Sequence, residues 1–408
     1  MNKINMNTKN NQLLFLLLGL IVTIFASSIK SVYQIYFVDL PSIYSLSRSQ
    51  VSLLGALFGL FVGVFSPFTG WLCDKYGPSL TIFSGVMIAV IGFFGIYIFD
   101  TLILLIFCFS ILLSYALTAM TFIPFGVLID KIFQNNEKNL TYTILSNGTA
   151  IGFIVLSPLW VYLNKYISWE NINAIVSLLF LFILSPIGYY FWKKFPNTVK
   201  TKKIDLDEDV KHKIKNYIFE KKYALLALSF GGCGMTMAFI DVHLVALLKT
   251  VDIYHIFQSN NSFVAISLST LGITELIGSF LVLWAINRYN LYLVLGFLYL
   301  VRAMVFLLMN LSSSDSLYMI FIAIFGLTYM GTVIISSLIC LRWYGIEIKG
   351  RMFGILFLVH QIFVFISIWL GGLLYDFFAS YESYVYSLIF MCLIAGFASF
   401  KLYAINDD

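Results

Sequence analysis

The sequence predicts an all-α membrane protein with twelve transmembrane helices in two pseudo-symmetric six-helix bundles. Three observations support this fold class. Hydrophobic residues fill 60% of the 408 positions and charged residues fill only 11%, well below the roughly 25% of a soluble domain. Apolar runs of about 20 residues, the length that crosses a bilayer, are separated by short polar breaks. One longer charged break divides these runs into two sets of six.

Each apolar run predicts a helix, because hydrocarbon offers no hydrogen-bond partner to a backbone that is not satisfied internally. The first run follows a polar start with Lys3 and Lys9, so a cleaved secretory signal is the alternative interpretation. Removing it would leave an odd number of spans, and we therefore expect it to be retained. In chain order the predicted spans are 12–36, 50–72, 79–99, 101–131, 141–164, 171–193, 222–249, 262–287, 291–311, 315–341, 351–376 and 382–404.

The basic residues predict the orientation of the chain. With a cytoplasmic N-terminus, Arg48, Lys165 and Lys249 fall on outer segments, Lys30 and Arg302 fall within helices, and the rest of the 25 Lys and Arg fall on the cytoplasmic side. The positive-inside rule then places both termini in the cytoplasm. Tight loops and a modest length favour a bacterial inner membrane, with a eukaryotic membrane as the alternative.

The charged break at 195–221 predicts a cytoplasmic linker. It contains Lys200-Thr201-Lys202-Lys203 and the acidic stretch 205–209. Its simplest role is a solvated tether that helps to retain the loop inside the cell, with binding to anionic lipid or to a partner as the alternative. The predicted domains are an N-terminal bundle at 1–194, this linker, and a C-terminal bundle at 222–408.

The sequence also disfavours several classes of protein. A nucleotide-driven pump needs a phosphate-binding loop of the form Gly-x4-Gly-Lys-Ser/Thr, which the sequence lacks. It also lacks a metal-ligand cluster and a nucleophile elbow, so we expect no enzymatic activity, no cofactor and no metal. The net charge of +5 reflects membrane orientation, and we expect no nucleic-acid partner.

A weak internal repeat relates the two halves. A shift of 213 residues aligns the ends of the second and eighth spans, although Asn287 stands opposite Asp74. Duplicated halves of this kind place a substrate site at their interface near the middle of the membrane. The aligned pairs are Gly59 with Gly272, Trp71 with Trp284, Lys75 with Arg288 and Tyr76 with Tyr289.

The stretch Gly70-Trp71-Leu72-Cys73-Asp74-Lys75-Tyr76-Gly77 lies between the second and third spans. Together with the twelve spans, the central linker and the degenerate second copy, it resembles the major facilitator superfamily over nearly the whole chain. The resemblance implies two six-helix halves and transport by alternating access. It also implies a gating or structural role for Gly70, Asp74, Lys75 and Gly77, with ordinary interfacial charge as the alternative for Asp74.

Further stretches resemble the monocarboxylate-porter branch of this superfamily and its bacterial relatives, which include oxalate–formate exchangers. The chain also departs from that branch. Ser279 stands one turn after Glu275, where the animal carriers place an arginine, and His360 stands where oxalate exchangers use a basic residue. The resemblance therefore implies a carboxylate without specifying which one. The matching stretches are Lys30-Ser31, Ser157-Pro158-Leu159, Ser168-Trp169, Phe239-Ile240-Asp241-Val242-His243-Leu244 and His360-Gln361.

Four charged residues lie in the middle of predicted spans: Lys30, Asp241, Glu275 and Arg302. A charge at the bilayer centre costs about 2.5–3.5 kcal/mol on insertion scales, so each one needs a structural or functional reason. Two positive and two negative charges balance one another. Such a set can bind an anion while it exchanges partners with a carboxylate.

These charged residues define the candidate site. We expect Lys30 to attract an anionic substrate, with a permanent ion pair or snorkelling as the alternative. We expect Glu275 and Asp241 to couple protons, with helix locking as the alternative. Asp241 is preferred to His243, which lies roughly 200° away around the helix. We expect Arg302 to be structural and to bridge to Asp241 or to backbone carbonyls within its own half.

Four polar residues complete the predicted substrate site, because ligand sites combine apolar walls with a few directional groups. They are His360, Gln361, Asn147 and Tyr329, and packing is the alternative for each. We therefore predict a secondary transporter that moves a small organic anion, a carboxylate, by proton symport. The alternatives are an anion exchanger, a permease for a carboxylate siderophore or an amino acid, and a transporter-like sensor without flux. The expected partners are the substrate anion, the proton and the lipid bilayer, and we expect a monomer.

Overall fold

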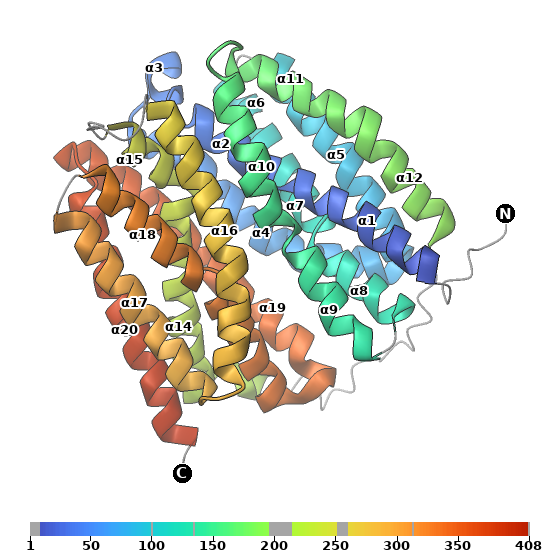
Figure 1. Cartoon of the computed structure of the whole chain (residues 1–408), viewed down its shortest axis with the longest axis vertical. Helices are drawn as coiled ribbons and strands as arrows, with labels where there is room; N and C mark the ends of the chain where they lie inside the picture. The colour runs from blue at the N-terminus through green and yellow to red at the C-terminus, as the bar shows by residue number, and fades with distance from the viewer. Residues whose placement is uncertain are drawn as a thin grey trace. The chain divides into compact units, whose positions relative to one another are not determined.

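The computed structural model describes residues 9–98, 101–133, 135–195, 214–250, 260–311 and 314–406. Across these ranges the chain is helical, with short turns between the helices (Figure 1). Most of the predicted linker at 195–221, namely residues 196–213, lies outside the described residues.

The helices follow one another along the chain with few residues between them, and three of the spans contain a π-helical segment, labelled η. In order they are α1 (Lys9–Ala26), α2 (Ser28–Tyr36), α3 (Leu40–Tyr44), α4 (Arg48–Tyr76), α5 (Pro78–Ile98), α6 (Leu102–Ile106), η1 (Phe107–Leu113), α7 (Ser114–Ala119), α8 (Phe122–Ile132), α9 (Asn135–Ser146), α10 (Gly148–Leu163), α11 (Trp169–Leu179), η2 (Phe180–Leu184), α12 (Ser185–Lys194), α14 (Lys221–Ala238), η3 (Phe239–His243), α15 (Leu244–Thr250), α16 (Asn260–Ile286), α17 (Leu291–Leu311), α18 (Asp315–Thr328), α19 (Gly331–Phe378) and α20 (Glu382–Asn406).

Twelve helical stretches of the described chain are long and apolar enough to cross a membrane, which confirms the predicted all-α membrane fold. Their ends lie within a few residues of the predicted ones, because a helix can continue beyond its apolar run into polar residues. The stretches are Lys9–Tyr36, Arg48–Tyr76, Pro78–Ile98, Leu102–Ile132, Leu140–Leu163, Trp169–Lys194, Lys221–Lys249, Asn261–Ile286, Leu291–Leu311, Asp315–Gly345, Ile348–Phe378 and Glu382–Ile405.

Several spans are interrupted at polar residues where the apolar pattern gives no sign of a break. The first is interrupted at Ser27, the fourth at Met120–Thr121, the fifth at Asn147 and the tenth at Tyr329–Met330. Irregular backbone at membrane depth is tolerated only where protein or a water-lined cavity surrounds it. The interruptions therefore mark the buried side of these spans.

Contacts divide the described chain into two compact units. The first contains Met1–Tyr36 and Leu57–Lys202, and the second contains Phe37–Ala56 and Lys203–Asp408. Residues 37–56 thus group with the second unit although they precede the predicted linker.

In the first unit α5 packs against α11 and α12, and α1 packs against α10 (Figure 1). Two glycines make the second of these contacts possible. A Cβ atom at Gly148 would overlap the hydroxyl of Thr23, and one at Gly152 would overlap the hydroxyl of Ser27. Small residues at these positions let the two helix backbones approach closely, as is common between membrane helices.

In the second unit α17 lies along α20, α14 packs against both α19 and α20, and α16 packs against α18 (Figure 1). The facing side chains form an apolar core in which Leu226, Phe230, Leu295 and Ile335 are fully buried.

An acidic cap attaches residues 37–56 to the second unit. Asp376, near the end of α19, accepts hydrogen bonds from the backbone N–H groups of Arg48 and Ser49 at 2.8 and 2.9 Å. These N–H groups belong to the first turn of α4, where they have no partner within the helix and where a negative charge is favourable. We call this contact the Asp376 cap.

Close packing accompanies the Asp376 cap. A Cβ atom at Gly372, one turn before Asp376, would lie 2.5 Å from the hydroxyl oxygen of Ser52. The Arg48 guanidinium lies 5.2 Å from the centre of the Phe37 ring and 5.3 Å from that of Tyr375. The start of α4 is therefore held by one carboxylate, two aromatic rings and one glycine contact.

Candidate functional site

A polar cluster in the second unit lies at the interruption between α18 and α19. Tyr329 follows the last residue of α18, and its hydroxyl donates a hydrogen bond to Oδ1 of Asp241 at 2.8 Å. Asp241 lies on η3 within the seventh span. The interruption thus brings Tyr329 of the tenth span into a hydrogen bond with Asp241 of the seventh. The predicted roles of these two residues were separate, namely substrate binding for Tyr329 and proton coupling for Asp241.

Asp241 and His243 contact different neighbours although both lie on η3. Nε2 of His243 lies 2.9 Å from the carbonyl oxygen of Ile368, so this nitrogen carries the proton and donates. Nδ1 then accepts from the hydroxyl of Tyr381 at 3.3 Å, and burial raises the pKa of that tyrosine. His243 therefore belongs to the packing against α19, whereas Asp241 belongs to the polar cluster.

Glu275 is the second carboxylate beside Tyr329. It lies on α16, is 7% exposed, and interacts electrostatically with the Tyr329 hydroxyl, as Asp241 does. One carboxylate is hydrogen-bonded to the phenol and the second lies within electrostatic range of it, and buried carboxyl groups in polar surroundings can hold and release a proton.

Arg302 lies behind this cluster on α17 and is fully buried. Its guanidinium donates five hydrogen bonds, all to neutral oxygens. Two of the acceptors are the backbone carbonyls of Thr328 and Tyr329, at 2.8 and 3.1 Å. The structure thus places Arg302 against backbone carbonyls of its own unit. Arg302 is connected to Asp241 through Tyr329: it donates to the Tyr329 carbonyl, and the Tyr329 hydroxyl donates to Asp241.

His360 and Gln361 lie on α19 and are 5% and 7% exposed. The His360 ring stacks on Phe357 with 5.6 Å between ring centroids, and it contacts Phe230 at 4.4 Å. Two aromatic contacts fix the plane of the imidazole ring. Both predicted residues are therefore buried side chains of the second unit.

Lys30 and Asn147 lie in the first unit. Lys30 is half-buried on α2, one turn after the interruption at Ser27. Asn147 is buried and occupies the interruption between α9 and α10, next to the glycine that contacts Thr23. The two predicted residues thus lie near interruptions in the first and fifth spans.

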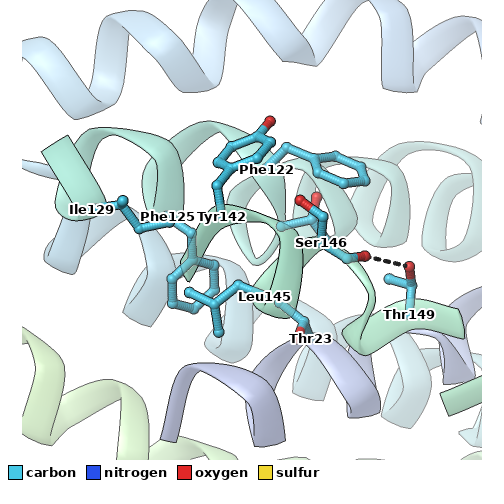
Figure 2. A pocket seen from close by; sticks show the side chains of 9 residues that line it. Thr23, Phe122, Phe125, Ile129, Tyr142, Leu145, Ser146 and Thr149 are labelled. Carbon is cyan, nitrogen blue, oxygen red and sulfur yellow. Dashed lines mark hydrogen bonds between the residues drawn. The ribbon is translucent and has the colours of Figure 1, made fainter. Parts of the chain in front are cut away.

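A narrow pocket lies between α1, α8, α9 and α10 in the first unit (Figure 2). Hydroxyl groups of Thr23, Thr121, Ser146 and Thr149 line it together with aromatic side chains, and the Thr149 hydroxyl donates to the Ser146 carbonyl at 3.3 Å. Its free space is about 10 Å³, close to the room that one water molecule needs. The pocket is therefore too small for an organic acid.

The stretch Gly70–Gly77 ends α4 and leads into α5. Asp74 and Lys75 are exposed, and the Lys75 ammonium lies 4.7 Å from the centre of the Trp71 ring. Gly77 has a φ of +95°, which L side chains rarely adopt, and its N–H donates to the Cys73 carbonyl at 3.1 Å. The last glycine is therefore required by the turn between the two spans.

We expect Gly77→Ala to destabilise the protein by about 1–2 kcal/mol, because a Cβ atom is strained at positive φ. Gly70→Ala is the matched control, since a Cβ atom at Gly70 would meet nothing within 4 Å. Thermal unfolding of the purified proteins in detergent measures both effects. Equal melting temperatures for the two variants would contradict the conformational explanation.

Sequence reasoning did not identify the Asp376 cap or the hydroxyl groups that bind Arg302. Arg48 and Asp376 stand at the ends of apolar runs, where charge is ordinary. Thr236 and Thr328, which accept hydrogen bonds from Arg302, resemble the many other hydroxyl residues of this chain. A charged arginine within an apolar run needs hydrogen-bond acceptors around it. This need was the available sign in the sequence that hydroxyl groups would gather around Arg302.

Comparison with known proteins assigns this architecture to a family. Residues 16–249 match the model of the Major Facilitator Superfamily. A relative from Bacillus subtilis (strain 168), named "Uncharacterized MFS-type transporter YcxA", is 23% identical over 375 residues, which cover 88% of this chain and 88% of the relative. The chain belongs to the Major Facilitator Superfamily. It is a multi-pass membrane protein of a transporter family.

Proposed function

We propose that this protein carries a small organic anion, a carboxylate, across the membrane by alternating access together with a proton. The hydrogen bond between Tyr329 and Asp241, with Glu275 beside it, is the observation that supports this proposal most strongly. Acidic groups are costly inside a membrane-spanning bundle and usually mark ion or proton pathways. In this proposal Glu275 and Asp241 exchange the coupled proton.

Lys30 supports the proposal that the substrate is an anion. It is a half-buried ammonium group on the first span, and in this fold substrate sites lie between the two halves near the middle of the membrane. In the proposal Lys30 binds the carboxylate, while His360, Gln361, Asn147 and Tyr329 provide directional contacts. The resemblance to the monocarboxylate-porter branch supports the same class of substrate.

We further propose that the protein lies in a bacterial inner membrane with both termini in the cytoplasm. The distribution of Lys and Arg supports the orientation, and the relative named an MFS-type transporter is bacterial. The chain is proposed to work as a monomer.

A direct test uses purified protein in liposomes with radiolabelled formate, lactate, oxalate, citrate and leucine as probes. An inward proton gradient is expected to drive accumulation of at least one of the carboxylates and to leave leucine outside. Exchange without any response to the proton gradient would favour an anion exchanger. Binding without flux would favour a sensor.

Glu275→Gln is expected to retain exchange of the transported acid and to lose its uphill accumulation. The amide keeps the size of the carboxyl group but does not ionise at ordinary pH, so it cannot take up and release the coupled proton. Counterflow and gradient-driven uptake, measured in the same liposomes, separate the two effects. Glu382→Gln, an exposed position on α20, is the control and should change neither rate. Equal loss of both activities in Glu275→Gln would indicate a structural role.

A further inference from the structure

We propose that Arg302 is a positioning residue for the Asp241 carboxylate, because it holds together the two segments that carry Asp241 and its partner Tyr329. The inference rests on the proposed function, in which Asp241 takes part in proton coupling. The geometry that it invokes can be tested without transport.

Arg302 holds the segment that carries Tyr329. At the end of a helix the last carbonyls have no partner within the helix. Arg302 supplies partners here, with Nη2 at 2.8 Å from the Thr328 carbonyl and 3.1 Å from the Tyr329 carbonyl. Nε donates to the Thr328 hydroxyl at 3.0 Å. The backbone from which the Tyr329 side chain extends is therefore fixed by one guanidinium group.

Arg302 also holds the span that carries Asp241. Nη1 of Arg302 donates to the hydroxyl of Thr236 at 2.8 Å. Thr236 lies on α14 in the same span as Asp241 and shortly before η3 begins. A guanidinium is a rigid planar fork, so its hydrogen bonds on either side fix the distance between the groups that accept them. Arg302 thus braces the seventh span against the interruption in the tenth.

The surroundings of Arg302 stabilise its buried charge. Arg302 is fully buried, and its guanidinium carbon lies 4.9 Å from the centre of the Phe325 ring and 5.8 Å from that of Tyr299. Cation–π contacts and neutral acceptors together stabilise the buried charge. A lysine at this position would keep the charge but would lose the fork, so charge and geometry can be separated by substitution.

A stability cycle on purified protein tests the positioning role. Tyr329→Phe and Asp241→Asn alter the two ends of one hydrogen bond, so the double variant is expected to lower the melting temperature by clearly less than the sum of the single variants. In an Arg302→Lys background the decreases in melting temperature caused by Tyr329→Phe and Asp241→Asn are expected to become additive, because the Tyr329 hydroxyl is no longer held within hydrogen-bond distance of Asp241. The proposal is overturned if Arg302→Lys lowers the melting temperatures of the wild type, the two single variants and the double variant equally, so that the coupling between Tyr329 and Asp241 persists. Arg302 would then serve only the stability of the fold.

Two further variants keep this test decisive. Thr328→Val removes one acceptor of Arg302 and replaces Arg302→Lys if that variant does not fold. Tyr299→Phe is the matched control for Tyr329→Phe, because it removes another buried tyrosine hydroxyl, which donates to the Ser229 carbonyl. The losses of Tyr299→Phe and Asp241→Asn are expected to be additive in every background. Coupling between Tyr299 and Asp241 would show that the cycle does not report the hydrogen bond between Tyr329 and Asp241. That outcome would overturn the positioning role of Arg302 drawn from the cycle.

Transport of lactate and oxalate in proteoliposomes links the same variants to the proposed function. Arg302→Lys is expected to lower gradient-driven accumulation about tenfold, the equivalent of one hydrogen bond to a charged group, while exchange stays within about twofold. In a Tyr329→Phe background Arg302→Lys is expected to cause no further loss of gradient-driven accumulation. A further tenfold loss of accumulation in this background would overturn the proposal. If the wild-type protein accumulates neither acid, the proposed function fails for these probes, and the stability cycle still decides the role of Arg302.

Discussion

Lys30→Ala is expected to abolish binding of the transported anion. On α2 the side chain of Lys30 is half-buried beside Ser31 and Gln34, which are buried, polar and uncharged. Without the ammonium group a carboxylate would leave water for neutral partners alone, at a cost of several kcal/mol. We expect the affinity to fall by about a hundredfold or more, the equivalent of at least 2.8 kcal/mol. Isothermal titration with the acid that the wild-type protein accumulates measures this change.

Two control variants separate charge from folding. Lys30→Arg keeps a positive charge and is expected to retain much of the affinity. Lys165→Ala removes an exposed ammonium group that lies 5.8 Å from the centre of the Tyr162 ring, and it should bind as the wild type does. Wild-type affinity in a folded Lys30→Ala protein would remove Lys30 from the substrate site.

Asp376→Asn is expected to release the start of α4 and to expose Ser52. The substitution replaces a charged acceptor of two backbone N–H groups by a neutral one, which costs about 1 kcal/mol at an exposed helix N-terminus. That cost raises the population of the released state roughly fivefold. Labelling of a Ser52→Cys variant by a membrane-impermeant maleimide measures the exposure, because Ser52 is fully buried against Gly372 in the intact contact.

The labelling experiment has matched controls. The five native cysteines are buried and are expected to react slowly. Glu382→Gln removes a carboxylate six residues further along the chain that takes no part in the cap, and it should leave the labelling rate unchanged. Slow labelling of Ser52→Cys in the Asp376→Asn protein would show that packing at Gly372 alone holds the start of α4.

The fold was predictable from the sequence because membrane insertion imposes a simple pattern. A backbone in hydrocarbon must satisfy its own hydrogen bonds, so each apolar run had to be a helix. The run that predicted a span at 50–72, for example, is the centre of α4 (Arg48–Tyr76). The interruption at Tyr329 was not predictable in this way, because it is stabilised by a guanidinium group 27 residues earlier in the sequence.

The candidate site was predictable in part. Asp241, Glu275 and Arg302 attracted attention because charge is expensive at membrane depth. The partners of Asp241 and Arg302 depend on side-chain geometry between separate helices, which periodicity does not encode. The sequence placed Tyr329 among the groups that bind substrate, but it gave no sign that the Tyr329 hydroxyl donates a hydrogen bond to Asp241. The functional roles of these residues stay predictions, and the stability cycle and the transport assays above test them.

The unbroken course of α4 has a mechanical consequence. Residues 48–56 of this helix belong to one unit and residues 57–76 to the other, and the helix continues through Pro67. A rod of 29 residues is about 44 Å long. A tilt that lifts its first turn away from Asp376 must therefore also move the far end, where Asp74 and Lys75 lie. One continuous helix therefore connects the residues of the Asp376 cap with the exposed charges of Asp74 and Lys75 at its other end.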